Sequence, residues 1–113
     1  MTPNEYQKAC MRTLSEECKA DPGLGLLNGL MGLNGEAGEC IDIYKKAMFQ
    51  GHALDVEHIA KELGDVAWYL AISAESIGYD LEKIFKMNVD KLMARYPEGF
   101  DADLSQNRVE GDI

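Results

Sequence analysis

Residues 26–48 read LLNGLMGLNGEAGECIDIYKKAM, and apolar side chains recur among them every three or four positions. This period is typical of an amphipathic α-helix. Glycines at positions 29, 32, 35 and 38 interrupt the segment, and each costs a helix about 0.8–1 kcal/mol relative to alanine. Either the helix breaks there, or bare backbone is needed for close approach by another helix or a ligand. The apolar period continues through the glycines, so we favour the second interpretation.

The flanking segments predict three further helices. The first starts at Thr2-Pro3-Asn4-Glu5, with a capping residue and a proline at the first helical position, and ends at Asp21-Pro22-Gly23. Asp55 and Asp80 are suitable N-caps for the other two helices, which end at Gly78 and before Pro97. No segment of useful length alternates in the manner of a β-strand. The sequence therefore predicts an all-α bundle of four helices.

With 113 residues, the chain is short enough to form one domain. We expect residues 1–100 to form it and the acidic segment 101–113, which lacks an apolar period, to be a flexible tail. Four helices of this length bury only a limited core. The wide apolar helix faces are therefore expected to be shared with further copies, in a homodimer or a homotetramer.

Composition excludes several classes of function. The 20 acidic residues outnumber the 11 basic ones, giving a formal net charge of -9, which disfavours binding to a nucleic-acid polymer. No apolar run approaches the roughly 18 residues of a membrane span, and the polar N-terminus lacks a signal-peptide pattern. The three cysteines are an odd number without a CxxC pair. These features together predict a cytoplasmic protein that does not interact with membranes.

Two acidic pairs lie within apolar parts of consecutive predicted helices. They are Glu36 with Glu39, and Glu62 with Asp65. The i,i+3 spacing places each pair on one helix face, and an antiparallel arrangement can bring the two pairs level. Four carboxylates that close repel one another unless they are protonated or neutralised by a metal ion. Oxygen-only ligation suits a hard cation such as Mg²⁺, with Mn²⁺ as a substitute.

Asn88, Lys91 and Arg95 form a polar row along the last predicted helix. Such a row can be an ordinary solvated face whose basic end favours the helix dipole. It also has the donors that the outer oxygens of a metal-bound polyphosphate require.

The segments Gly35-Glu36-Ala37-Gly38-Glu39 and 62–70 (ELGDVAWYL) resemble the ExxE…ExxD signature of MazG-like nucleotide pyrophosphohydrolases, an all-α superfamily. The similarity also includes Lys45-Lys46, Phe49-Gln50-Gly51-His52 and the 88–97 segment, and it covers about residues 26–100. The resemblance implies a small house-cleaning hydrolase. Such an enzyme cleaves a nucleoside triphosphate between the α and β phosphates and releases a monophosphate and pyrophosphate.

The resemblance also implies roles for particular residues. Mg²⁺ would be held by the four motif acids Glu36, Glu39, Glu62 and Asp65. On chemical grounds we further expect Glu39 and Glu62 to be catalytic, with Glu39 orienting or deprotonating the attacking water. The substrate would be bound through Lys45 or Lys46, Lys91 and Arg95 at the phosphates and Asn88 near the nucleoside.

Two alternatives remain open from the sequence. A related pyrophosphohydrolase acting on another substrate, of the phosphoribosyl-ATP type, would carry the same acidic residues. A catalytically silent helical interaction module is the other alternative, and the presence of all four acids disfavours it. A di-iron bundle is a poor match, because its two Glu-x-x-His motifs are represented only by Asp55-x-x-His58. The role of His52 is undetermined.

Overall fold

The structure is a computed structural model that describes residues 1–113. It contains no β-strand, so the predicted all-α fold is confirmed. The chain divides into two compact units, Met1–Leu81 and Glu82–Ile113. The helices are α1 (Pro3–Cys10), α2 (Glu16–Ala20), α3 (Pro22–Phe49), α4 (Val56–Ser76), α5 (Leu81–Arg95) and α6 (Ala102–Gln106). No helix combines the length and the apolar character that crossing a membrane requires.

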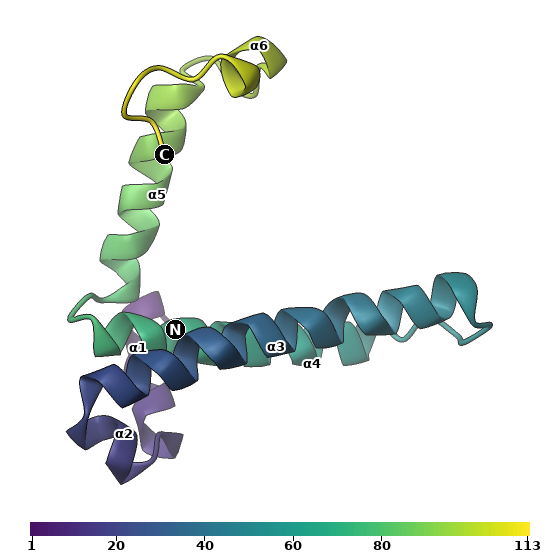
Figure 1. The fold of residues 1–113 in the computed structure, drawn as a ribbon, viewed down its shortest axis with the longest axis vertical. Coiled ribbons are helices and arrows are strands. Elements are labelled where there is room, and N and C mark those ends of the chain that lie inside the picture. Colours follow the sequence, from purple (N-terminus) through teal and green to yellow (C-terminus); the bar gives the residue numbers. More distant parts are fainter. The chain divides into compact units, whose positions relative to one another are not determined.

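The first unit is built on the hairpin of α3 and α4, which lie side by side and share the most extensive contact between elements (Figure 1). Helix α3 is continuous over 28 residues and includes all the glycines that interrupt its apolar period. Asp21 caps it by accepting hydrogen bonds from the backbone N–H groups of Gly23 and Leu24. This cap starts the helix at Pro22, earlier than the apolar period alone indicates. Asp55 caps α4 by accepting from the N–H of His58, as predicted.

Glycines let the two long helices approach closely at one end of the hairpin. A Cβ atom at Gly29 would lie 3.2 Å from both the Cα and the Cβ of Ser73 on α4. A Cβ at Gly32 would overlap the ring of Tyr69. The interpretation that bare backbone serves close helix packing is confirmed at these positions. Gly35 and Gly38, by contrast, have no neighbouring atoms within 4 Å of such a Cβ.

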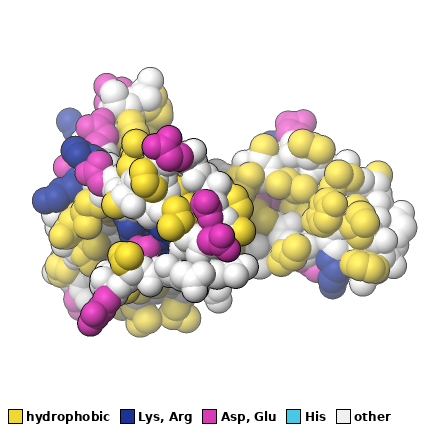
Figure 2. Space-filling view, turned by 90° about the horizontal axis from the view of Figure 1, so that it is seen from above, with side chains coloured by type: hydrophobic (Ala, Val, Ile, Leu, Met, Phe, Trp, Pro, Cys, Tyr) yellow, Lys and Arg dark blue, Asp and Glu magenta, His cyan; other side chains and the backbone are white.

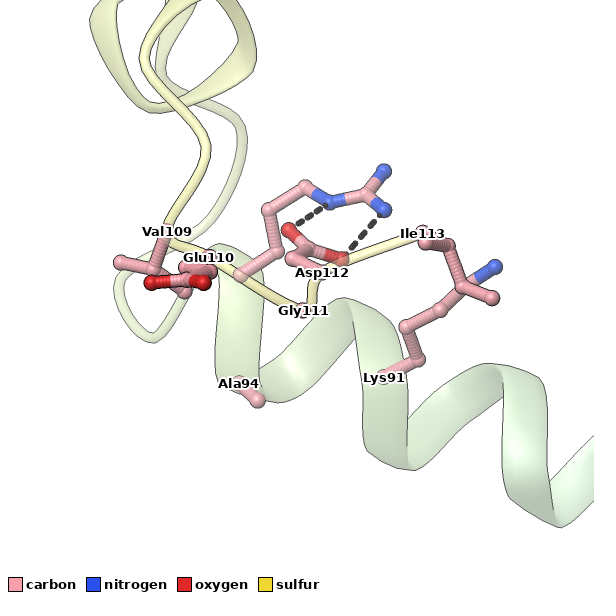
Figure 3. A pocket seen from close by; sticks show the side chains of 8 residues that line it. Lys91, Ala94, Val109, Glu110, Gly111, Asp112 and Ile113 are labelled. Atoms are coloured by element: carbon pink, nitrogen blue, oxygen red, sulfur yellow. Dashed lines mark hydrogen bonds and ion pairs between the residues drawn. The ribbon is translucent and has the colours of Figure 1, made fainter.

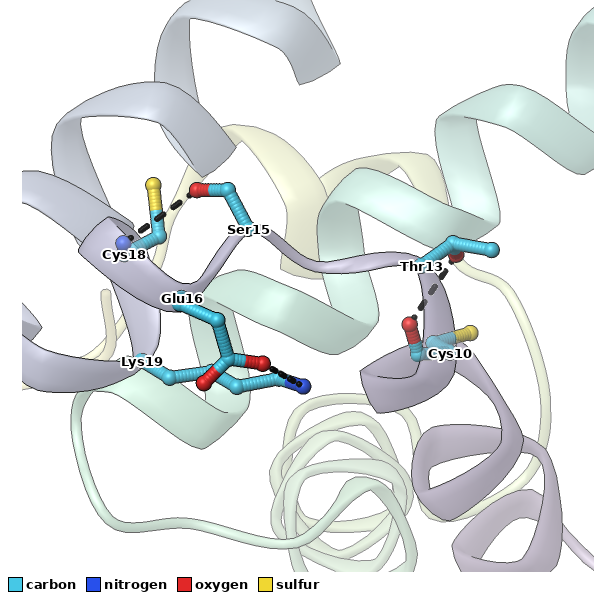
Figure 4. A network of polar contacts seen from close by, with 6 residues as sticks. All are labelled: Cys10, Thr13, Ser15, Glu16, Cys18 and Lys19. Carbon is cyan, nitrogen blue, oxygen red and sulfur yellow. Dashed lines mark hydrogen bonds and ion pairs between the residues drawn. The ribbon is translucent and has the colours of Figure 1, made fainter.

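The N-terminal region differs from the single helix predicted before Asp21. Helix α1 starts with the predicted capping box of Thr2 and Glu5. After a short 3₁₀ turn, the chain becomes extended at Leu14 and Ser15. The Ser15 hydroxyl then accepts from the N–H of Cys18 and begins α2 (Figure 4). The prediction of one helix was wrong because a serine N-cap restarts the chain in a new direction.

The core of this unit includes a buried glutamine. Gln7, which is 5% exposed, donates to the Glu75 carboxylate at 2.8 Å and to the Tyr79 carbonyl at 3.0 Å. Its side-chain oxygen accepts from the Leu81 N–H at 2.7 Å. Gln7 therefore ties α1 to the end of α4 and the start of α5. The buried apolar side chains of this unit are Cys10, Leu14, Ala71, Ile72, Ala74 and Leu81.

The second unit consists of α5 after Leu81, α6 and the residues that follow. Asp101 caps α6 by accepting from the N–H groups of Asp103 and Leu104. The segment 107–113 then returns along α5, where Asp112 pairs with Arg95. Flexibility of residues 101–113 stays a prediction, although the structure gives them a short helix and an ion pair.

Candidate functional site

Three of the four predicted acids meet between the two long helices. Glu36 of α3 and Glu62 and Asp65 of α4 each offer a carboxylate oxygen, and these oxygens all lie within 4.8 Å of one another. Glu36 and Glu62 are half-buried and Asp65 is exposed. The antiparallel hairpin places the ExxE and ExxD motifs level with each other, as the spacing predicts. This arrangement forms a compact acidic group open to solvent, which we call the three-acid cluster.

The acids of the three-acid cluster repel one another when no positive charge lies near them. A hydrogen bond with Glu62 raises the pKa of Glu36, with further contributions from partial loss of hydration and from repulsion by Glu62, Asp65 and Glu39. A proton shared between two carboxyl groups relieves that repulsion. A divalent cation would relieve it more completely, and a donor set made only of carboxylate oxygens fits Mg²⁺ or Mn²⁺.

Glu39 lies outside the three-acid cluster. It follows Glu36 by three residues on α3, is exposed, and contributes no oxygen to the group. Its charge still reaches Glu36 on one side and Lys46 on the other, where it adds to the raised pKa of each. The structure therefore separates Glu39 from the other acids while keeping it beside them.

His58 contacts the cluster and has no place in the sequence-based site. Its Nε2 atom lies 3.1 Å from Oε1 of Glu62, one helical turn along α4. This contact involves only Oε1 of Glu62, so the other carboxylate oxygen has no bond to His58. A hydrogen bond of this kind fixes the orientation of a carboxylate that binds a metal ion. The i,i+4 spacing of His58 and Glu62 on one helix was the available sequence signal.

The two candidate lysines of α3 both bind an acid on their own helix. Asp42 lies 3.2 Å from Nζ of Lys45 and 2.8 Å from Nζ of Lys46. Hydrogen bonds from Lys46 and then Lys45 lower the pKa of Asp42, and Asp42 in turn raises the pKa of Lys46. Both lysine side chains stay about half exposed. Asp42 thus holds them in place and leaves them accessible to an anion.

The remaining candidates lie in the second unit or have structural contacts. Asn88 and Lys91 are exposed on α5, whereas Arg95 is largely buried against Asp112. His52 is exposed in the loop between α3 and α4. The indole N–H of Trp68 donates to the Thr13 hydroxyl at 2.9 Å, so this aromatic residue joins α4 to the N-terminal turn.

The fold and the cluster together define an all-α protein with an oxygen-only acidic site on a helical hairpin. The profile of the MazG nucleotide pyrophosphohydrolase domain matches residues 26–100, and the chain belongs to this family. It is also 31% identical over 96 residues to the Gene 37 protein of Mycobacterium phage L5, covering 81% of this chain and 82% of that protein. No solved structure shows a significant match.

Proposed function

We propose that the protein is a Mg²⁺-dependent nucleoside triphosphate pyrophosphohydrolase that cleaves between the α and β phosphates. The observation that carries the proposal is the convergence of Glu36, Glu62 and Asp65 from two helices within 4.8 Å. Membership of the MazG family supports the nucleotide substrate and the pyrophosphohydrolase chemistry.

In this proposal the three-acid cluster holds the metal ion through carboxylate oxygens. When bound, Mg²⁺ neutralises the triphosphate and makes a bound water more acidic. His58 keeps the Glu62 carboxylate in orientation. Glu39, adjacent to the cluster but outside it, accepts a proton from the attacking water or orients that water.

The proposed reaction is a hydrolysis. Water forms a bond to the α phosphorus, and the bond from that phosphorus to the bridging oxygen breaks. The products are a nucleoside monophosphate and pyrophosphate. Lys91 and Arg95 stabilise the charge that develops on the departing pyrophosphate, and Lys45 or Lys46 binds the phosphate chain. Asn88 would bind the nucleoside, as the family resemblance implies, and the open space at Gly35 and Gly38 leaves room for water or phosphate.

The test separates metal binding from catalysis. Pyrophosphate release is measured over a panel of nucleoside triphosphates and phosphoribosyl-ATP, with Mg²⁺ or with EDTA, and Mg²⁺ binding is measured by calorimetry. We expect Glu62→Gln to lose both turnover and Mg²⁺ binding. Glu39→Gln should bind Mg²⁺ but lose about 10²–10⁴-fold in kcat, the usual contribution of a general base. Glu57→Gln is the matched control, because Glu57 lies on α4, pairs with Lys61 and contributes no oxygen to the three-acid cluster.

Near-normal turnover by Glu62→Gln would refute the assignment of the metal site. Release from phosphoribosyl-ATP alone would establish the alternative substrate. No release from any compound, with or without Mg²⁺, would identify a silent interaction module.

A further inference from the structure

Arg95, a proposed phosphate-binding residue, binds a carboxylate of its own chain. Its Nε and one terminal nitrogen donate to the two oxygens of Asp112, both at 2.7 Å (Figure 3). The two side chains are only 9% and 11% exposed. This paired geometry is the one by which arginine recognises carboxylate and phosphate groups. The guanidinium is therefore occupied in the way that a phosphate would occupy it.

Asp112 lies beside basic side chains of α5, in a cavity whose other side carries the acid Glu110. A cavity of about 370 Å³ lies between α5 and the 109–113 segment, and Lys91, Ala94 and Arg95 line its α5 side (Figure 3). The hydrogen bonds from Arg95 hold the pKa of Asp112 below its usual value, and the charges of Arg108 and Lys91 add to the effect. One cation thus binds the Asp112 carboxylate, and two more act on it through their charge.

Asp112 is also the principal anchor of its segment. Val109 and Ile113, on either side of it, are 76% and 88% exposed, so apolar burial contributes little to docking. The turn in which the Asp112 N–H donates to the Val109 carbonyl is internal to the segment. An anion that displaces Asp112 from Arg95 would therefore release the whole segment from α5.

We propose that Asp112 is an internal competitor for the phosphate chain at Arg95. The 107–113 segment then keeps the Arg95 guanidinium occupied until a polyphosphate displaces Asp112. The inference rests on the proposed function, in which Arg95 binds phosphate. A tethered carboxylate competes at a high effective concentration, whereas pyrophosphate brings more charge and more acceptor oxygens. The result is an autoinhibitory contact that the substrate itself relieves.

The first test measures binding of inorganic pyrophosphate by calorimetry in EDTA, so that neither metal nor turnover is involved. Asp112→Asn should bind pyrophosphate about tenfold more tightly than the wild type. This factor is expected if Asp112 has left Arg95 in about a tenth of the wild-type molecules. Glu110→Gln removes the same charge from the same segment without touching the ion pair, and should bind as the wild type does. Arg95→Ala should lose most of the binding.

The second test follows the segment itself. Arg108 is exposed, but the residues that follow it lie against α5. Because proteases prefer mobile chain, trypsin should cleave after Arg108 faster once the segment leaves α5. Pyrophosphate should accelerate this cleavage in the wild type and in Glu110→Gln. In Asp112→Asn the cleavage should be fast without pyrophosphate.

The inference is overturned if Asp112→Asn binds pyrophosphate no more tightly than Glu110→Gln, or if Arg95→Ala binds it as well as the wild type. Neither result depends on hydrolysis. A chain that hydrolyses no nucleotide can still show tighter binding in Asp112→Asn, and an active enzyme can fail to show it. Failure of the inference and failure of the proposed function are thus distinguishable.

Discussion

Glu36 shows how a single side chain reports on the proposed metal site. Its pKa is raised, first by the hydrogen bond with Glu62. The folded protein therefore retains a proton at Glu36 at pH values where the unfolded chain, with its ordinary pKa of 4.5, has lost it. Stability falls with rising pH wherever the folded state binds more protons. The metal-free protein should lose this contribution as pH rises from 4.5 through the raised pKa.

We therefore predict a pH-dependent difference between the melting temperatures of the wild type and Glu36→Gln, both measured in EDTA. The wild type minus the variant should be lower at pH 7 than at pH 5. The comparison with Glu36→Gln removes the opposite dependence from Asp42 and Asp112, whose pKa values are lowered. Mg²⁺ at pH 7 should raise the melting temperature of the wild type more than that of the variant. A difference between the two proteins that stays constant with pH would show that folding does not raise the pKa of Glu36.

Sequence spacing could place these acids on helix faces but could not determine which ones meet. Glu36 and Glu39 have the same i,i+3 relation as Glu62 and Asp65, yet only Glu36 joins the cluster. The packing of α3 on α4 makes this distinction, and sequence spacing on one helix carries no information about it. The role of Asp112 is still less visible, because its partner Arg95 is 17 residues away with no periodic pattern between them.

The ends of helices were more predictable, because they depend on neighbouring residues. Thr2 and Asp55 form the expected N-caps, and Gly78 follows α4 with a φ of 76°, a conformation that favours glycine. The break at Ser15 was missed because the apolar period continues across it. Gln7 was missed for another reason, since its three partners lie at least 68 residues further along the chain.

Helix α3 allows a matched test of its glycines. Gly29→Ala should destabilise the protein by roughly 1–3 kcal/mol, because the added methyl group would press on the backbone of α4 at Ser73. Gly35→Ala should stabilise it by about 0.8–1 kcal/mol, since no atom lies within 4 Å and alanine favours a helix. Urea denaturation of both variants measures the difference. Equal destabilisation by the two substitutions would contradict the assignment of close packing to Gly29 and not to Gly35.

The chain as a whole leaves much apolar surface uncovered. Figure 2 shows hydrophobic side chains spread over the surface, including the distal part of the α3–α4 hairpin. On α3, Ile41 is 63% exposed, Met48 59% and Phe49 81%. An open groove of about 580 Å³ runs along these residues and is lined mainly by apolar groups. On α5, Phe85 and Leu92 are 42% and 39% exposed. Apolar surface this extensive is typical of an interaction site.

We propose that further copies of the chain cover the face formed by Ile41, Tyr44 and Met48, giving the homodimer or homotetramer expected from the short core. Sedimentation equilibrium should then give a mass at least twice the 12.5 kDa of the chain. The double variant Ile41→Glu, Met48→Glu should sediment as a monomer, because charged side chains in an apolar interface lose their hydration without gaining partners. Val109→Glu, at a position that is 76% exposed and outside the hairpin, should assemble as the wild type does. A wild type that sediments at the mass of one chain, or a double variant that still assembles, would show that this face does not join the copies.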